Sequence, residues 1–186
     1  MKLYIKYMVS SRCQGMVKNE LERIGIHNAV VELGEVEIKE SISPSQKEEF
    51  SIALRRIDLQ LIEDKKIILV ERIKIVIIKL IHFTDKVLKV NFSEHLSKIL
   101  KYNYTYLANL FSRTTGSTIE KLIIKHKIER VKELILHDEL TITEIAHKLN
   151  YSSVSHLSNQ FKRITGLTPT SFKRLRHKRL RGLENV

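Results

Sequence analysis

The chain has 186 residues, 42% of them apolar, so it can fold as one large or two small domains and is not intrinsically disordered. Its formal net charge is +12, and residues 1–64 carry 9 Lys and Arg against 11 Asp and Glu, whereas residues 65–186 carry 24 against 10. A basic excess confined to the second part is expected of a surface that binds phosphates, and the six Gly and two Pro favour a mostly helical chain.

The first 64 residues alternate between strand and helix patterns. Lys2 to Met8 has an apolar residue at every second position of its first half, and Arg12 to Ile24 has apolar residues at helical spacing. The predicted elements are a strand over 2–8, a helix over 12–24, strands over 29–33 and 35–38, a helix over 44–57 and a strand over 59–62. The order βαββαβ predicts a ferredoxin-like sandwich.

The segment from Met8 to Cys13, followed by an amphipathic helix, resembles heavy-metal-associated domains. That family binds soft metals through Cys-x-x-Cys, but here Ser10 stands where the first cysteine would be. One thiolate with one hydroxyl is a poor soft-metal site, so we expect neither a metal nor a cofactor, and we expect Cys13 to be partly buried at the start of the helix. Redox sensing by an activated thiolate, or a metal shared by two protomers, stays open as an alternative.

Residues 65–84 are expected to form a connecting helix within a linker over 65–88. Val70, Ile73, Ile77 and Leu80 form one stripe, which further apolar residues widen. So broad an apolar surface suggests burial against the N-terminal domain or a second protomer. Four charged residues between Ile67 and Phe83 make the segment unsuited to crossing a bilayer.

The C-terminal region matches itself at an offset of 50 residues, without gaps. The identical pairs are Leu107/Leu157, Asn109/Asn159, Phe111/Phe161, Arg113/Arg163, Thr115/Thr165, Gly116/Gly166 and Thr118/Thr168, with Glu94/Glu144 and Lys98/Lys148 upstream. The region therefore contains two copies of one structural unit.

Each copy has the pattern of a helix, a short turn and a second helix. In the second copy, Thr141-x-x-Glu144 is a capping box, residues 150–153 form a polar turn, and a helix over 154–165 ends at Gly166. The expected buried positions of that helix are Leu157, Phe161 and Ile164.

The first copy has the same order of elements. It opens at Asn91-x-x-Glu94 and turns at residues 101–103, and Leu107, Leu110 and Phe111 face inward. Between the copies, Ser117-x-x-Glu120 is expected to cap a longer helix that reaches about His137.

Residues 90–176 resemble the DNA-binding domain of the AraC/XylS family of bacterial regulators. The sharpest match is Ile142 to Ala146, Tyr151, and Leu157 to Phe172; Lys127 replaces the family's usual Arg in the linker helix. The resemblance implies seven helices and two recognition helices that enter successive major-groove segments on one face of the DNA.

The exposed faces of the two recognition helices are the candidate site. The resemblance places base contacts at Thr105, Ala108 and Asn109 in the first unit and at Val154, Ser155, His156 and Asn159 in the second. Asn suits the edge of adenine, whereas the cations are better suited to phosphates, which set register but carry no sequence information. The phosphate candidates are Arg113, Lys162, Arg163 and, at the start of a basic tail, Lys173.

We therefore predict an α+β chain with a ferredoxin-like domain over 1–64, a connecting helix over 65–88 and an all-α double helix-turn-helix domain over 89–186. The expected function is sequence-specific, non-enzymatic transcription regulation in the cytoplasm, with double-stranded DNA as partner and no membrane contact. Contact with RNA polymerase, and a homodimer through residues 65–84 or the N-terminal domain, stay open.

Two alternatives remain at this stage. A metal-handling protein would need the missing second cysteine. A DNA-repair protein that accepts an alkyl group on Cys13 would need an activating neighbour, but Glu20 and His27 offer no recognisable spacing.

Overall fold

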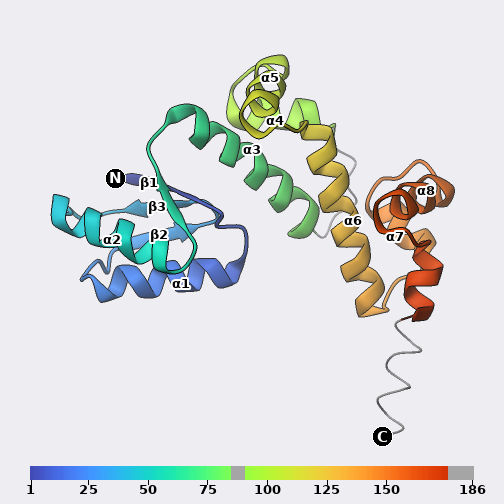
Figure 1. The fold of residues 1–186 in the computed structure, drawn as a ribbon, viewed down its shortest axis with the longest axis horizontal. Helices are drawn as coiled ribbons and strands as arrows, with labels where there is room; N and C mark the ends of the chain where they lie inside the picture. Colours follow the sequence, from blue (N-terminus) through green and yellow to red (C-terminus); the bar gives the residue numbers. More distant parts are fainter. Residues whose placement is uncertain (85–90, 176–186) are drawn as a thin grey trace, which may run out of the picture.

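The computed structural model describes residues 1–84 and 91–175, which form a sheet-containing N-terminal half and a helical half (Figure 1). The N-terminal elements are β1 (Lys2–Lys6), α1 (Ser11–Arg23), β2 (Ala29–Glu32), β3 (Glu35–Ile38), α2 (Pro44–Arg56) and β4 (Gln60–Ile62). Their order is the predicted βαββαβ, and every boundary lies within two residues of its predicted position.

The four strands form one antiparallel sheet in the order β2-β3-β1-β4. Leu3 of β1 lies opposite Val36 of β3, and Ile5 lies opposite Leu61 of β4. Helices α1 and α2 cover one face of the sheet (Figure 1). Because alternate strand residues point to that face, they form one core with the apolar sides of the two helices.

Cys13 lies in the first turn of α1 and is half-buried, as predicted. Ser10 caps this helix: its hydroxyl accepts a hydrogen bond from the backbone N–H of Cys13, and its Oγ lies 3.2 Å from the Cys13 Sγ. Burial alone would raise the pKa of the Cys13 thiol, but the hydrogen bonds from Ser10 and the backbone outweigh it and lower this pKa. Among the described residues, no three His, Cys, Asp or Glu side chains lie close enough to hold a metal.

The helical half contains α3 (Lys65–His82), α4 (Phe92–Leu100), α5 (Tyr104–Thr115), α6 (Ile119–His137), α7 (Ile142–Lys148) and α8 (Val154–Thr165). Residues 169–175 are also helical, so the described residues 91–175 contain six helices, and the seven that the resemblance implies are reached only when α3, upstream of the matched region, is included. None of the described helices is both long and apolar enough to cross a membrane. Linker residues 85–88 and the basic tail from Arg176 onward lie outside the described residues.

Helix α3 packs inside the helical half. Its residues Val70, Ile73 and Ile77 are at most 1% exposed and belong to the same core as α4, α5 and α6. The sequence predicted burial against the N-terminal domain or a second protomer, and the main partner of this stripe is instead the following helices of the same chain. The boundaries of the domains stay predictions, but α3 shares its core with the helices that follow it.

A second side of α3 contacts the turn between β2 and β3. Gly34 in this turn has a φ of +74°, and a Cβ atom placed on it would lie 1.9 Å from the Cδ1 of Ile75. Beside this contact, the Lys79 ammonium lies 2.9 Å from the Glu32 carboxylate. Gly34 therefore permits both the turn and the close approach of the two halves.

We expect Gly34→Ala to destabilise the protein by about 2 kcal/mol, because it adds the strain of a positive φ to the overlap with Ile75. Urea unfolding measures this cost. Gly25→Ala is the matched control, since Gly25 has a φ of +79° but no atom within 4 Å of the added Cβ. Ile75→Val, which removes Cδ1, should reduce the excess cost of Gly34→Ala; equal costs at positions 25 and 34 would contradict the contact.

A polar cluster joins the end of α3 to the middle of α6. His82 Nδ1 lies 3.3 Å from a Glu133 carboxylate oxygen, and His82 Nε2 lies 3.3 Å from His126 Nδ1. Arg130 donates a hydrogen bond of 2.9 Å to the same carboxylate. Burial, and then the neighbouring His82, lower the pKa of His126, so this imidazole stays neutral over a wider pH range than a free one.

Candidate nucleic-acid interface

The two helix-turn-helix units begin and end their second helices in the same way. Asn103 caps α5 by accepting a hydrogen bond from the Thr105 N–H at 2.8 Å, and Ser153 caps α8 by accepting one from the His156 N–H at 3.0 Å. Both helices end at a glycine in the left-handed region, Gly116 with φ +69° and Gly166 with φ +79°. These are the caps that helix ends require, 50 residues apart.

The side-chain hydrogen bonds after each helix repeat as well. The Thr115 hydroxyl donates to the Phe111 carbonyl at 2.8 Å and accepts from the Ser117 N–H at 3.2 Å. The Thr165 hydroxyl donates to the Phe161 carbonyl at 2.8 Å and accepts from the Leu167 N–H at 3.2 Å. The predicted duplication is therefore confirmed at the level of individual hydrogen bonds.

The capping box at Thr141 and Glu144 is confirmed, but two finer predictions are wrong. The cap of α6 is Thr118, whose hydroxyl accepts from the Lys121 N–H, and not Ser117. Ile164, which periodicity places on the buried face of α8, is 45% exposed. It lies in the last turn of α8, and periodicity alone does not show how far a neighbouring helix extends to cover that turn.

The predicted base-contacting residues lie on α5 and α8. Five of them are exposed: Thr105, Asn109, Ser155, His156 and Asn159. Ala108 and Val154 are half-buried. Ala108 and Val154 pack against the core that holds the buried Leu107 and Leu157. The five exposed residues therefore form the polar face of each helix, and Ala108 and Val154 lie at its edge.

The face of α8 borders a hollow of about 390 Å³ whose other wall is α6. His156, Asn159 and Arg163 line it from α8, and Lys121 and Ile124 line it from α6. Lys121 is exposed and has no ion pair among the described residues. Lys121 is therefore a cation beside the exposed face of α8. This position was not predicted from the sequence, because no sequence pattern places the start of α6 next to α8.

The start of α6 also contacts α5. The Tyr104 hydroxyl donates a hydrogen bond of 2.5 Å to the Glu120 carboxylate, which lowers the pKa of Glu120. Burial, and then this same hydrogen bond, raise the pKa of Tyr104. The first turns of α6 thus adjoin both recognition helices, and α5, α8 and α6 contribute to one candidate surface.

Lys127 holds the two units together from the middle of α6. Its ammonium lies 5.0 Å from the centre of the Tyr151 ring in the second unit and 5.7 Å from that of the Phe92 ring in the first. Burial lowers the pKa of Lys127. A cation between two ring faces favours one spacing of the units.

His156 is held in one orientation on the surface of α8. Its Nδ1 lies 3.0 Å from the Ser152 hydroxyl, and the edge of its ring packs on Tyr151 with 5.4 Å between ring centres. When the Ser152 hydroxyl donates to Nδ1, the proton sits on Nε2, which is then a donor available to a ligand. In that arrangement the Nε2–H of this exposed ring is available for a contact.

The same position in the first unit holds Tyr106, which the sequence-based list of contacts omits. It is 46% exposed and stacks on Tyr102, four residues earlier, with 5.5 Å between ring centres. His156 likewise contacts the residue four positions before it. The 50-residue offset pairs Tyr106 with His156, so the repeat alone is a signal by which Tyr106 could have been added to the candidate contacts.

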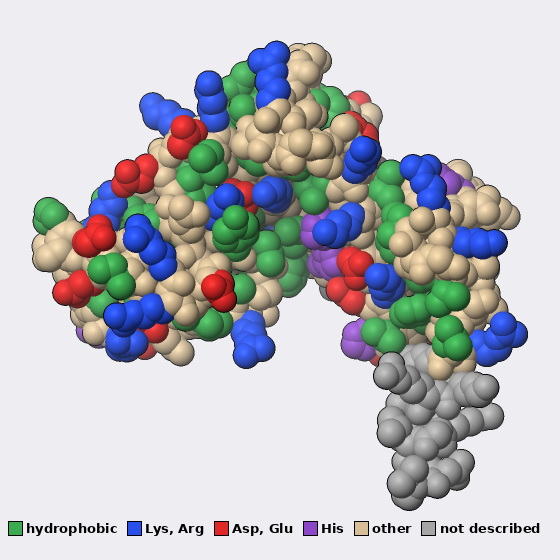
Figure 2. Space-filling model, in the orientation of Figure 1, with side chains coloured by type: hydrophobic (Ala, Val, Ile, Leu, Met, Phe, Trp, Pro, Cys, Tyr) green, Lys and Arg blue, Asp and Glu red, His purple; other side chains and the backbone are tan. Residues whose placement is uncertain are grey.

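The phosphate candidates differ in their surroundings. Arg113, Lys162 and Arg163 are exposed and have no ion pair among the described residues. Lys173 is instead paired with Asp138, its ammonium 2.5 Å from a carboxylate oxygen. Figure 2 shows Lys and Arg side chains along the outer rim of the helical half. The three unpaired cations are therefore better candidates than Lys173.

Comparison with known proteins places this surface in a known kind of domain. Residues 96–175 match the family model described as a helix-turn-helix domain. The chain is 33% identical over 70 residues to an uncharacterised HTH-type transcriptional regulator of Pseudoalteromonas carrageenovora, covering 38% of this chain and 41% of that protein. It is 26% identical over 116 residues to the probable transcriptional regulator LumQ of Photobacterium leiognathi, covering 62% of this chain and 45% of LumQ.

Among solved structures, the chain is similar to a DNA-binding transcriptional dual regulator from Escherichia coli K-12. The TM-score is 0.51 at 20% identity, over 59% of this chain and 93% of that one, so the likeness concerns the fold. The chain spans less than half the length of the curated relatives named above.

Proposed function

We propose that this protein is a sequence-specific DNA-binding transcription regulator of the AraC type. The observation that carries the proposal is the duplicated unit, in which two helices with polar N-caps and glycine C-caps each present a short polar face beside cations that have no ion pair among the described residues. The match of residues 96–175 to a helix-turn-helix domain supports it, as do the names of the relatives.

In this proposal, α5 and α8 enter successive major-groove segments on one side of the duplex. Asn109 and Asn159 donate to and accept from the edge of adenine, and His156 donates from Nε2 to a base acceptor. Thr105, Ala108, Val154 and Ser155 are small enough to let both helices approach the bases. The Lys127 contact with both units keeps the two helices at one spacing.

Arg113, Lys162 and Arg163 bind phosphates, and Lys121 adds a contact from the start of α6. Lys173 would first have to leave Asp138, so its contribution to DNA binding is smaller. In this proposal the protein acts by binding and not by catalysis. Its place of action is the cytoplasm, where DNA is accessible.

We also infer that residues 1–64 form a ferredoxin-like sandwich. The βαββαβ order and the sheet order β2-β3-β1-β4 support this. A homodimer and a contact with RNA polymerase stay predictions from the sequence.

The test is selection of bound sites by the full chain from a random pool of duplex DNA. We expect enrichment of a motif with two blocks of preferred bases, about one helical turn apart and roughly 34 Å between centres. If all sequences are retained equally, the chain binds DNA only through non-specific attraction to its basic surface, and the proposal is overturned.

Two substitutions on α8 should separate reading from anchoring. Asn159→Ala should relax the preference at one base position, at a cost of about 1–3 kcal/mol on the selected site. Arg163→Ala should instead weaken binding to the selected site and to random DNA by the same factor. Competition binding with both DNAs measures the two effects, and indistinguishable behaviour of the two variants would show that the roles are misassigned.

Tyr106 provides the corresponding test of the first unit. Tyr106→Ala should weaken binding to the selected site about tenfold and alter the preference in the block read by α5, while binding to random DNA changes little. Tyr106→Phe keeps the ring and its stacking on Tyr102, so it separates the ring from the hydroxyl. Unchanged base preferences in Tyr106→Ala would remove this residue from the reading face.

A further inference from the structure

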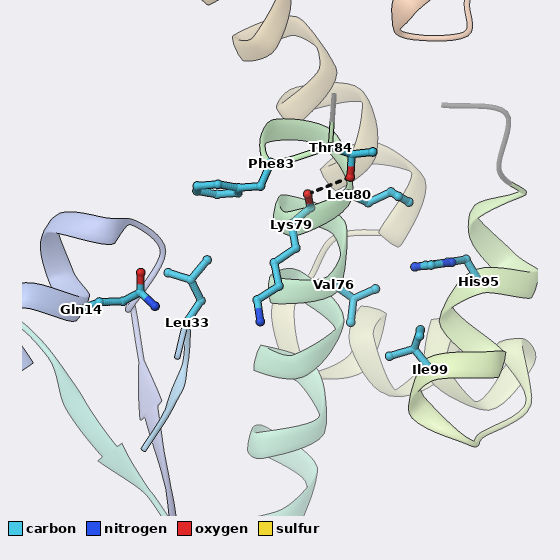
Figure 3. A pocket seen from close by; sticks show the side chains of 9 residues that line it. All are labelled: Gln14, Leu33, Val76, Lys79, Leu80, Phe83, Thr84, His95 and Ile99. Atoms are coloured by element: carbon cyan, nitrogen blue, oxygen red, sulfur yellow. Dashed lines mark hydrogen bonds between the residues drawn. The ribbon is translucent and has the colours of Figure 1, made fainter. Parts of the chain in front are cut away.

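A groove separates the N-terminal half from the first helix-turn-helix unit, and no residue of α5 or α8 lines it. Its larger part has a volume of about 560 Å³ and lies between the β2–β3 turn, the end of α3, and α4 (Figure 3). A smaller part of about 240 Å³ adjoins it and shares Leu33, Val76, Lys79 and Ile99. The larger volume falls in the range of sites for small molecules.

The walls of the groove are apolar and only partly covered by the rest of the chain. Figure 3 shows Leu33 and Phe83 on one side, with His95 and Ile99 of α4 facing Val76 on the other. Phe83 is 58% exposed and Ile99 is 47% exposed, so two large apolar side chains border an open space. Filling that space would remove apolar surface from water, which favours a ligand with an apolar body.

One face of α3 adds positive charge to these walls. Arg72, Val76, Lys79 and Phe83 follow one another at spacings of four, three and four residues, so they lie on one side of the helix. Arg72 lines the smaller part of the groove, and among the described residues it has no hydrogen-bond or ion-pair partner for its side chain. An unpaired guanidinium beside apolar walls is suited to a carboxylate, which it can bind with two hydrogen bonds.

Glu35 lines the smaller part of the groove together with Arg72, and both Glu35 and Glu32, the partner of Lys79, are already paired. Glu35 pairs with Lys2 at 3.5 Å, and Glu32 pairs with Lys79 at 2.9 Å. The Lys79–Glu32 pair is about half exposed, with side-chain exposures of 46% and 54%, so it is weak enough for Lys79 to turn toward a bound anion. The groove therefore combines apolar walls with one free and one releasable cation.

We propose that this groove binds a small amphipathic organic anion, with its apolar body between Leu33, Phe83 and Ile99 and its carboxylate at Arg72 and Lys79. Because Leu33 belongs to the N-terminal half and Ile99 to the first helix-turn-helix unit, a bound anion contacts both halves at once. Occupation of the groove favours the arrangement of the two halves in which these walls face each other. The proposal does not depend on DNA binding.

The test is calorimetric titration of the full chain, without DNA, with decanoate and with 1-naphthoate, a chain-like and a flat amphipathic carboxylate. We expect saturable binding of at least one of them at one site per chain, and at least tenfold weaker binding of the uncharged analogue with the same body, decanol or 1-naphthalenemethanol. Binding of neither carboxylate, or equal binding of the uncharged analogue, overturns the proposal.

Three variants locate the site. Arg72→Gln and Ile99→Asp should each weaken carboxylate binding at least tenfold, the first by removing charge and the second by placing a carboxylate in the apolar wall. Ile52→Asp is the matched control, because Ile52 is 41% exposed on α2, outside the groove, and its replacement should leave binding unchanged. Circular dichroism checks that each variant is folded. Unchanged binding in Arg72→Gln, or equal losses in Ile99→Asp and Ile52→Asp, would place the bound anion elsewhere.

Discussion

Raising the salt concentration from 50 to 200 mM is expected to weaken binding to the selected DNA site about 10³–10⁵-fold, if the protein neutralises about six to ten phosphates. The physical reason is the release of counterions from the duplex when Lys and Arg replace them. The basic excess of residues 65–186, with 24 Lys and Arg against 10 Asp and Glu, and the unpaired Arg113, Lys162 and Arg163 supply the positive charge.

Fluorescence anisotropy at several salt concentrations measures the slope of log affinity against log salt. Arg163→Gln should lower the magnitude of this slope by about 1, since it removes one phosphate contact. Lys18→Gln, on α1 of the N-terminal half, is the control and should leave the slope unchanged. A slope near zero for the unmodified protein would be incompatible with phosphate anchoring by this surface.

Truncation of the buried aromatic residue in either helix-turn-helix unit is expected to have the largest effect on stability. Phe161 is 0% exposed and its ring packs on Phe172, with 5.6 Å between ring centres. Phe111, its counterpart 50 residues earlier, is 2% exposed. Phe161→Ala and Phe111→Ala should each lower the free energy of unfolding by about 3–5 kcal/mol, because each removes buried apolar surface and leaves a cavity.

Since whole domains are stable by only about 5–15 kcal/mol, either variant brings the helical half close to unfolding. Urea titration followed by circular dichroism measures the loss. Ile164→Ala is the control within α8: this residue is 45% exposed, so its truncation should cost about 0.5 kcal/mol or less. If Phe161→Ala and Ile164→Ala cost the same, the assignment of the buried face of α8 is wrong.

Much of the local structure follows from the sequence because it depends on residues close together in the chain. The capping box at Thr141, the glycines at 116 and 166, and the alternation of β1 are each determined by hydrogen bonds or side-chain periodicity within a few residues. The 50-residue repeat extends this to the second helix of each unit, whose glycine end and threonine hydrogen bonds recur, whereas the first helices, α4 and α7, differ in length and in their caps. The repeat pairs Tyr106 with His156, whereas the contact positions given by the family resemblance omit Tyr106.

Other features required the folded chain because they depend on contacts between distant segments. Periodicity indicated that α3 must be buried but did not identify α4, α5 and α6 as its partners. It also could not show that Lys127 lies between two rings, or that Lys121 lies beside the reading face of α8. The contacts of the two lysines join residues 24 or more positions apart, and their identity is decided by how the helices pack against each other.

The amino-acid order alone determined the two helical units, their caps, the βαββαβ order of the first half and the location of the positive charge, since each depends on near neighbours or on composition. Only the tertiary structure decided which helix α3 supports, how close Gly34 lies to Ile75, and which side chains border the groove. Those outcomes depend on how the surfaces of distant elements fit together after the elements have formed. No short stretch of sequence determines such packing by itself.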